Sequence, residues 1–153
     1  MRFFLIVGSF LLGQILFAQN TEEWNYEDFF ESFFEEIYTQ LDKEKLDNYF
    51  SEDALILENG VVYDLKEFES KVDQMRKQFD EEAKSGYEFQ RKNELEFIEF
   101  RKHEKSLWIS LKNSASFTVG ETTIAELNSL VSAFLIEEAG NWKIQMYHMS
   151  LIN

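Results

Sequence analysis

Few side chains in this sequence could do chemistry, and His148 is the best single polar candidate. It lies in an alternating C-terminal segment and shares one predicted face with four mostly apolar residues: Trp142, Ile144, Met146 and Ser150. An extended strand would therefore bury the imidazole. A buried imidazole could exchange a proton or a hydrogen bond with a ligand near neutral pH, and Ser150 could add a contact. The alternative is a core histidine that bonds a neighbouring strand or Ser150.

Several other kinds of site are poorly supported. The sequence has no cysteine, so a thiol nucleophile is impossible. His103, the second of two histidines, lies far from His148 in a charged turn, which argues against a histidine-rich metal centre. There is no acidic calcium loop, no Gly-x-Ser-x-Gly motif and no glycine-rich phosphate loop. We therefore expect neither a metal nor a cofactor.

The composition excludes further classes of partner. The formal net charge is −14, and such a field repels phosphate backbones and anionic lipid headgroups. The chain holds 16 Phe, six Tyr and three Trp, which favours a large buried core over disorder. With no disulfide available, the stability of that core must come from packing.

The first 18 residues have the composition of a secretory signal. Arg2 precedes an apolar run that reaches Phe17, and Ala18 offers a small residue at the cleavage site. A membrane anchor is the alternative, but Gly8 and Gln14 interrupt the run, and a span needs about 20 apolar residues. Without a cysteine there is no site for lipid attachment. We expect residues 1–18 to be cleaved, residues 19–153 to form one domain, and the product to be secreted or periplasmic.

Helices are predicted in the first half of this domain. Residues 26–41 carry an aromatic stripe at helical spacing, and a short helix is expected over 43–50. The β-prone segments 54–58 and 61–63 flank Asn-Gly, the strongest short hairpin signal. Asp64 and Glu67 then form a capping box at the start of a third helix, which ends near residue 85.

From residue 87 onward the hydrophobic period changes to two. Strands are expected over 87–102, 105–119, 121–138 and 141–152, with glycine or charged residues at the turns between them. Long consecutive strands with tight turns predict an antiparallel meander.

This order of elements resembles the nuclear-transport-factor-2-like superfamily, which includes SnoaL-like cyclases and ketosteroid isomerases. Three local patterns carry the resemblance over residues 26–152: Phe50-x-x-Asp53-Ala54, the helix pair ending at Phe50, and Trp142-Lys143-Ile144-x-x-x-His148-x-Ser150. The resemblance implies an α+β cone: a curved antiparallel sheet wraps on the long N-terminal helix, with two further helices and a short hairpin. It also implies a small-molecule pocket and a homodimer formed through the outer face of the sheet.

The resemblance suggests a second catalytic candidate. Ketosteroid isomerases keep a proton-shuttling carboxylate shortly after the Asp-Ala pair, and counting from Ala54 gives Glu58. The isomerases' helix-one tyrosine falls on Ile37, with Tyr38 adjacent. A carboxylate buried in an apolar cone would suit acid–base work, whereas Asn59-Gly60 could instead leave Glu58 at an exposed hairpin tip.

Other residues should line or rim the cone and contact a ligand. They are Tyr63, Arg91, Trp108, Glu126 and Asn128, with Ser150. Period two shows which residues share a face but not which face is concave. Arg91 could equally pair with Glu99 across strands.

Three functions follow from these features. The first is an exported domain that binds a small apolar ligand without catalysis. The second is an isomerase, dehydratase or cyclase that acts on a cyclic carbonyl compound, with Glu58 or His148 as acid–base group. The third is a dimeric interaction module whose cone is only core.

Overall fold

The computed structural model describes residues 24–86 and 88–152. The predicted signal peptide lies outside the described residues. The first helix, α1 (Tyr26–Phe33), begins after Asn25, whose Oδ1 accepts a hydrogen bond from the backbone of Glu27 at 2.9 Å. It continues as a π-helical segment, η1 (Phe34–Thr39).

Short elements lead from this helix to the sheet. They are the 3₁₀ turn η2 (Lys43–Lys45), helix α2 (Leu46–Tyr49), and strands β1 (Phe50–Glu58) and β2 (Val61–Tyr63). Asn59 and Gly60 have φ values of 49° and 84°, so both central residues of the hairpin have the positive φ that a type I′ turn needs. The predicted hairpin is confirmed.

Helix α3 (Leu65–Lys84) follows the hairpin directly. The Asp64 side chain accepts from the Glu67 backbone at 2.8 Å, and the Glu67 side chain accepts from the Asp64 backbone at 3.0 Å. This reciprocal pair is the predicted capping box. Phe68 and Val72 are buried on the face of α3 that meets the rest of the molecule.

Four long strands complete the chain. They are β3 (Phe89–His103), β4 (Ser106–Val119), β5 (Thr122–Glu138) and β6 (Asn141–Ile152). They pair consecutively and antiparallel, as the meander prediction required. β1 then joins the free edge of β6 in parallel, which gives a mixed six-stranded sheet of order β2-β1-β6-β5-β4-β3.

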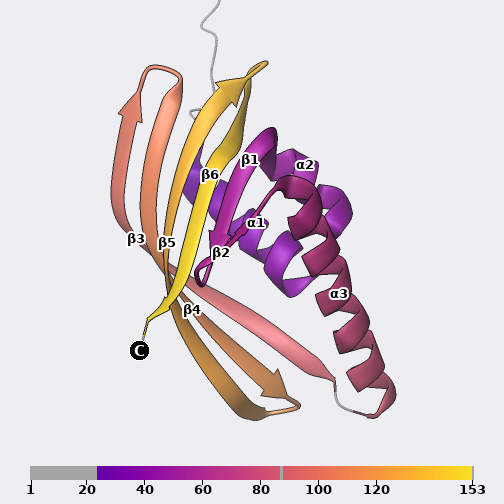
Figure 1. The fold of residues 1–153 in the computed structure, drawn as a ribbon. Helices are drawn as coiled ribbons and strands as arrows, with labels where there is room; N and C mark the ends of the chain where they lie inside the picture. The colour runs from indigo at the N-terminus through magenta and orange to yellow at the C-terminus, as the bar shows by residue number, and fades with distance from the viewer. Residues whose placement is uncertain (1–23, 87, 153) are drawn as a thin grey trace, which may run out of the picture.

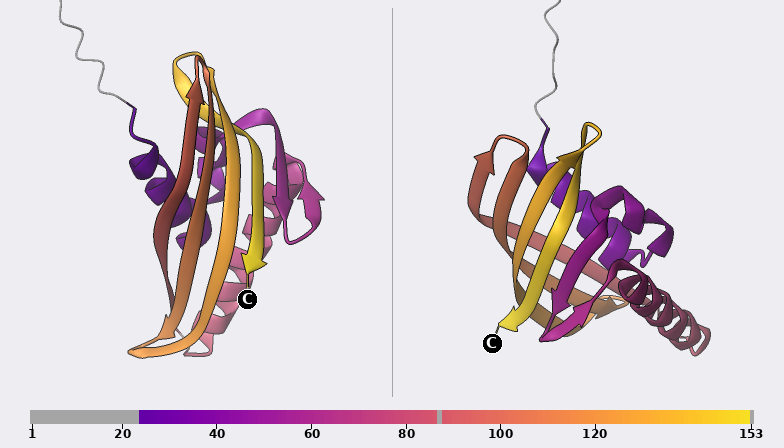
Figure 2. Two further views of the ribbon diagram at one scale, coloured as in Figure 1. Left: turned by 90° about the vertical axis from the view of Figure 1, so that its left-hand side faces the viewer. Right: turned by 45° about the horizontal axis from the view of Figure 1, so that its top comes forward.

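The sheet is strongly curved, and all helices lie on its concave side (Figure 1). Figure 2 shows α1 against the hollow of the sheet and α3 projecting past its edge. The core between them combines aliphatic side chains with an aromatic cluster, in which rings from α1, η1 and β1 meet Tyr147 of β6. The fully buried members with the largest side chains include Phe30, Phe33, Phe34, Phe68 and Tyr147. The predicted cone architecture is confirmed.

A bulge near the start of β6 decides which face each later residue of that strand takes. Phe134 pairs with Met146 but Leu135 pairs with Ile144, so Gln145 is an extra residue in β6. Ile144 and Tyr147 are therefore both buried, while His148 is exposed on the convex face. The prediction that His148 is buried is wrong, because it assumed unbroken alternation across residue 145.

No helix in residues 24–86 or 88–152 is long and apolar enough to cross a bilayer.

Candidate functional site

Glu58 is the buried acid of the cone. It ends β1, and only 2% of its surface is exposed. Its Oε1 accepts a hydrogen bond from the hydroxyl of Tyr38, and its Oε2 forms an ion pair with Nζ of Lys71. The hairpin therefore turns Glu58 inward, and the exposed-tip alternative is wrong.

The π-helical segment explains how Tyr38 reaches Glu58. The backbone of Gln40 donates to the carbonyl of Glu35 at 2.8 Å, five residues earlier, so η1 is wider than an α-helix. Phe34, Ile37 and Tyr38 of this segment are all buried. Ile37 and Tyr38 therefore both point inward, although they are consecutive residues. Tyr38, rather than Ile37, contacts Glu58.

Burial sets the protonation of this cluster. It raises the pKa of Tyr38 well above 10.0, with a further contribution from neighbouring Tyr147, so the phenol keeps its proton and can donate to Glu58. Partial burial lowers the pKa of Lys71, while the adjacent Glu58 carboxylate opposes that change by favouring the ammonium. Nζ of Lys71 also lies 5.1 Å from the ring centroid of Tyr63. The structure therefore brings two of the predicted site residues, Glu58 and Tyr63, together around Lys71.

Arg91 lies on the concave face, at the open end of the cone. Its guanidinium sits between two rings, 5.1 Å from the centroid of Tyr38 and 5.3 Å from that of Phe117. Its Nε donates to Oδ1 of Asn93 at 3.0 Å, and its Nη1 donates to the carbonyl of Tyr38 at 3.4 Å. Burial lowers the pKa of Arg91 because a desolvated cation is less stable. Glu99 does not pair with it; Nε of Arg101 donates to Glu99 at 2.7 Å.

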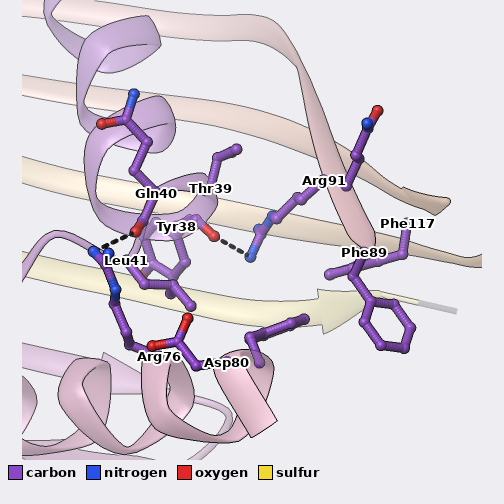
Figure 3. A pocket seen from close by; sticks show the side chains of 11 residues that line it. Tyr38, Thr39, Gln40, Leu41, Arg76, Asp80, Phe89, Arg91 and Phe117 are labelled. Carbon is purple, nitrogen blue, oxygen red and sulfur yellow. Dashed lines mark hydrogen bonds between the residues drawn. The ribbon is translucent and has the colours of Figure 1, made fainter. Parts of the chain in front are cut away.

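A pocket of about 170 Å³ opens beside Arg91 (Figure 3). Its walls come from the end of η1, the C-terminal half of α3, the start of β3 and the end of β4. Apolar lining is supplied by Leu41, Phe79, Phe89 and Phe117, and polar lining by Gln40, Arg76, Asp80, Gln90 and Arg91, with Tyr38 and Thr39 beside them. Aromatic and aliphatic side chains fill the deeper cone, so the room for a ligand lies at the mouth.

Polar side chains continue from Arg91 along the concave face. Nδ2 of Asn113 donates to Asn93 at 3.3 Å, and Oγ of Ser129 donates to the Asn113 carbonyl at 3.5 Å. Asn113 is 1% exposed, and its Oδ1 has no hydrogen-bond partner among the described residues. Asn93, Asn113 and Ser129 are polar residues at inward-facing positions of β3, β4 and β5. Our sequence analysis predicted only Arg91 of this polar group as a site residue.

The remaining predicted contacts lie on the other side of the sheet. Trp108 is 39% exposed, Glu126 and Asn128 are exposed, and Ser150 is half-buried opposite the exposed Leu130. Asn128 accepts from Ser114 at 2.8 Å on that convex face. The prediction that these residues line the cone is wrong because alternation shows that residues share a face of a strand but does not identify the concave face.

Lys71 and Tyr38 were absent from the predicted site. Lys71 lies three residues after the buried Phe68 and one before the buried Val72, so it borders the apolar face of α3. A lysine at that border can place its ammonium inside a core that holds a carboxylate. Among the described residues, no group of three acidic or histidine side chains could hold a metal ion.

The order of elements and the curved sheet agree with one family. Residues 27–153 match the family described as the SnoaL-like domain. The chain belongs to this SnoaL-like domain family. The wider nuclear-transport-factor-2-like superfamily predicted from the sequence is confirmed with it. No curated protein matches the chain.

Solved structures share the SnoaL-like fold at low sequence identity. ActVI-ORFA from Streptomyces coelicolor is 12% identical, with a TM-score of 0.65 over 82% of this chain and 90% of that one. A protein with a cystatin-like fold from Caulobacter vibrioides is 14% identical, with a TM-score of 0.63 over 83% and 87%. An NTF2-like protein from Cytophaga hutchinsonii is 15% identical, with a TM-score of 0.57 over 84% and 100%. These likenesses concern the fold alone.

Proposed function

We propose that this SnoaL-like domain binds a small, flat, largely apolar molecule in the pocket at the mouth of the cone. The observation that carries the proposal is the combination of about 170 Å³ of space with aromatic walls and a few polar groups at one side. Small-molecule sites usually combine an apolar lining with a small number of positioned polar groups. The SnoaL-like fold is one that binds small ligands and often catalyses reactions.

Ring contacts favour a flat ligand. The rings of Phe79 and Phe89 lie 5.9 Å apart at an interplanar angle of 78°, so together they form a corner. Phe117 also lines the pocket and is the register partner of Arg91 across β3 and β4. A planar body between these rings would gain both area burial and aromatic contacts.

A thermal-shift and calorimetric screen with small aromatic compounds tests this function. We expect at least one compound to stabilise the protein and to bind with one-to-one stoichiometry. Phe117→Trp should fill the pocket and abolish the effect, whereas Phe100→Trp, at an exposed site on β3, should not. If no compound binds, or if binding survives Phe117→Trp unchanged, the ligand does not use this pocket.

Acid–base catalysis on a cyclic carbonyl compound is a second candidate function. It is favoured by the buried Glu58 carboxylate, which holds the hydroxyl of Tyr38 while the same tyrosine lines the pocket. A ligand in the pocket would lie against Tyr38, so Glu58 would act through it: the phenol oxygen would take the ligand's proton while its own proton passes to Glu58. Glu58→Gln keeps the shape and removes the base, so it should abolish turnover of any substrate found in a panel of cyclic ketones. Unchanged turnover would exclude this role.

We also infer that the protein forms a homodimer through the convex face of the sheet. One row across four strands is apolar and solvent-facing: Leu55, Met146, Phe134 and Trp108 are successive register partners. Such a patch, on a sheet face without a covering layer, is typical of an association surface. Light scattering should give twice the chain mass; a monomer would contradict both the dimer and a purely interaction-based role.

Export remains part of the proposal. The apolar segment ending at Ala18 supports it, with residues 19–153 as the product. Mass spectrometry of the protein expressed in full in a bacterial host should find the chain in the periplasm or medium without its first 18 residues. Retention of those residues in a membrane-bound product would favour an anchor.

A further inference from the structure

The half-buried guanidinium of Arg91 is a charged group of the pocket that has unused hydrogen-bond donors. A guanidinium has five N–H donors, and the contacts within the described chain use one on Nε and one on Nη1. Both acceptors are uncharged: an asparagine amide and a backbone carbonyl. Figure 3 shows the side chain running from β3 toward Tyr38 along the wall of the pocket.

No carboxylate among the described residues forms an ion pair with Arg91, although the chain carries 29 acidic residues. A cation that is buried without a counter-ion is costly, and its lowered pKa reflects that cost. Buried arginines are usually matched by a carboxylate or phosphate held through two parallel hydrogen bonds. Within residues 24–86 and 88–152, Arg91 therefore has no carboxylate counter-ion.

The other charges of the pocket are consistent with an anionic ligand that carries a single charge. Arg76 lines it from α3, with Nη1 donating to the carbonyl of Gln40 at 3.2 Å, and Asp80 lies one turn further along the same helix. Two guanidinium groups and one carboxylate leave the lining with a net positive charge in a protein whose total charge is −14. Asp80 would disfavour a doubly charged group such as a phosphate monoester.

From these contacts we infer that the ligand of this pocket is a carboxylate with a flat apolar body, whose anionic head pairs with Arg91 while its body lies against Phe79, Phe89 and Phe117. This inference rests on the proposed binding function and specifies its ligand class. The guanidinium is held in place by Asn93 and by the rings of Tyr38 and Phe117, so little ordering remains to be done when the ligand binds.

Calorimetry with naphthoate and its neutral analogue naphthamide tests the inference, because the two differ in charge and hardly in shape. We expect naphthoate to bind at least about tenfold more tightly, as a charge-assisted pair should give. Arg91→Gln should remove that difference, because it lowers the affinity for naphthoate to about that for naphthamide. Arg91→Lys keeps the charge without the planar fork and should retain part of the preference. Arg101→Gln, at the exposed pair with Glu99, is the matched control and should behave as the parent protein.

The outcomes separate the two proposals. Equal binding of naphthoate and naphthamide would overturn the carboxylate inference and leave the pocket proposal standing. Binding of neither probe would overturn both. A preference for naphthoate that persists in Arg91→Gln, with the variant's melting temperature unchanged, would assign the anion to another cation and also overturn the inference.

Discussion

The hydroxyl of Tyr38 donates a hydrogen bond to Oε1 of Glu58, and this bond joins the first helix to the end of β1 inside the cone. The two residues are twenty positions apart, and each is inward for its own local reason. Tyr38 is turned by the π-helical segment, and Glu58 by the Asn59-Gly60 hairpin. Tyr38 also lines the ligand pocket, so one ring separates the pocket from the buried acid.

Tyr38→Phe should destabilise the protein by about 1–3 kcal/mol, because it leaves an oxygen of a buried carboxylate without its donor. The ring contacts of Tyr38 are kept in this variant. Tyr49→Phe is the control: its hydroxyl donates at 2.8 Å to Glu36, a carboxylate that water also reaches, so the loss should stay below about 1 kcal/mol. Urea unfolding of both variants measures the difference, and equal losses would contradict a special role for the Tyr38 bond.

Lys71→Met should cost more, about 3–5 kcal/mol, because the ion pair of Glu58 is lost while its carboxylate stays buried. Glu58→Gln should cost less, since the side chain of Lys71 is 30% exposed and its ammonium can turn to water. The double variant should recover most of the stability lost in Lys71→Met. A double-mutant cycle by urea unfolding measures this coupling, and additive losses would show that the pair is not coupled.

The sequence predicted the elements where local rules decide the structure. Asn59-Gly60 and the Asp64 box each act through neighbouring residues, so their geometry follows from residue type alone. The alternation of Leu107, Ile109 and Leu111 predicted that they share one face of β4, but only the structure shows that this face is the buried one.

The candidate site was predicted in part because its deciding features are not local. The extra residue Gln145 places His148 on the convex face of the sheet. The π-helical segment turns the side chain of Tyr38 into the core of the cone. Both changes depend on how the strand or helix packs against the rest of the cone. The family resemblance gave Glu58 as a candidate, and its expected place in the sheet gave Arg91. Only packing shows that Lys71 neutralises Glu58 and that no described carboxylate neutralises Arg91.

Stability should fall as the pH rises above about 10. Burial raises the pKa of Tyr38 and of Tyr147 above their ordinary value of 10.0. Above that pH the unfolded chain has lost protons that the folded chain still holds, so the folded state is the one that binds more protons, and raising the pH favours unfolding. Each tyrosine contributes up to about 1.4 kcal/mol per pH unit in this range.

Tyr147→Phe isolates one of these two groups. Its hydroxyl donates to the sulfur of Met149 at 3.6 Å and also interacts with the hydroxyl of Tyr38, so the variant should lose about 1 kcal/mol at neutral pH. The variant should lose stability less steeply than the parent protein above pH 10.0, as measured by urea unfolding at a series of pH values. Parallel slopes in the two proteins would show that the Tyr147 phenol does not titrate differently on folding.

Trp108→Glu should convert the proposed dimer to a monomer. Trp108 lies at the β3 end of the apolar row on the convex face, next to its register partner Phe134, and in a two-fold interface each substitution would place two charges in the contact. Because Trp108 is 39% exposed in the single chain, the variant should fold and keep its ligand affinity, since the pocket lies on the concave side. Lys66→Glu on the exposed side of α3 is the control with a larger charge change, and it should stay dimeric in sedimentation experiments. A Trp108→Glu protein that remains dimeric would move the contact to another surface.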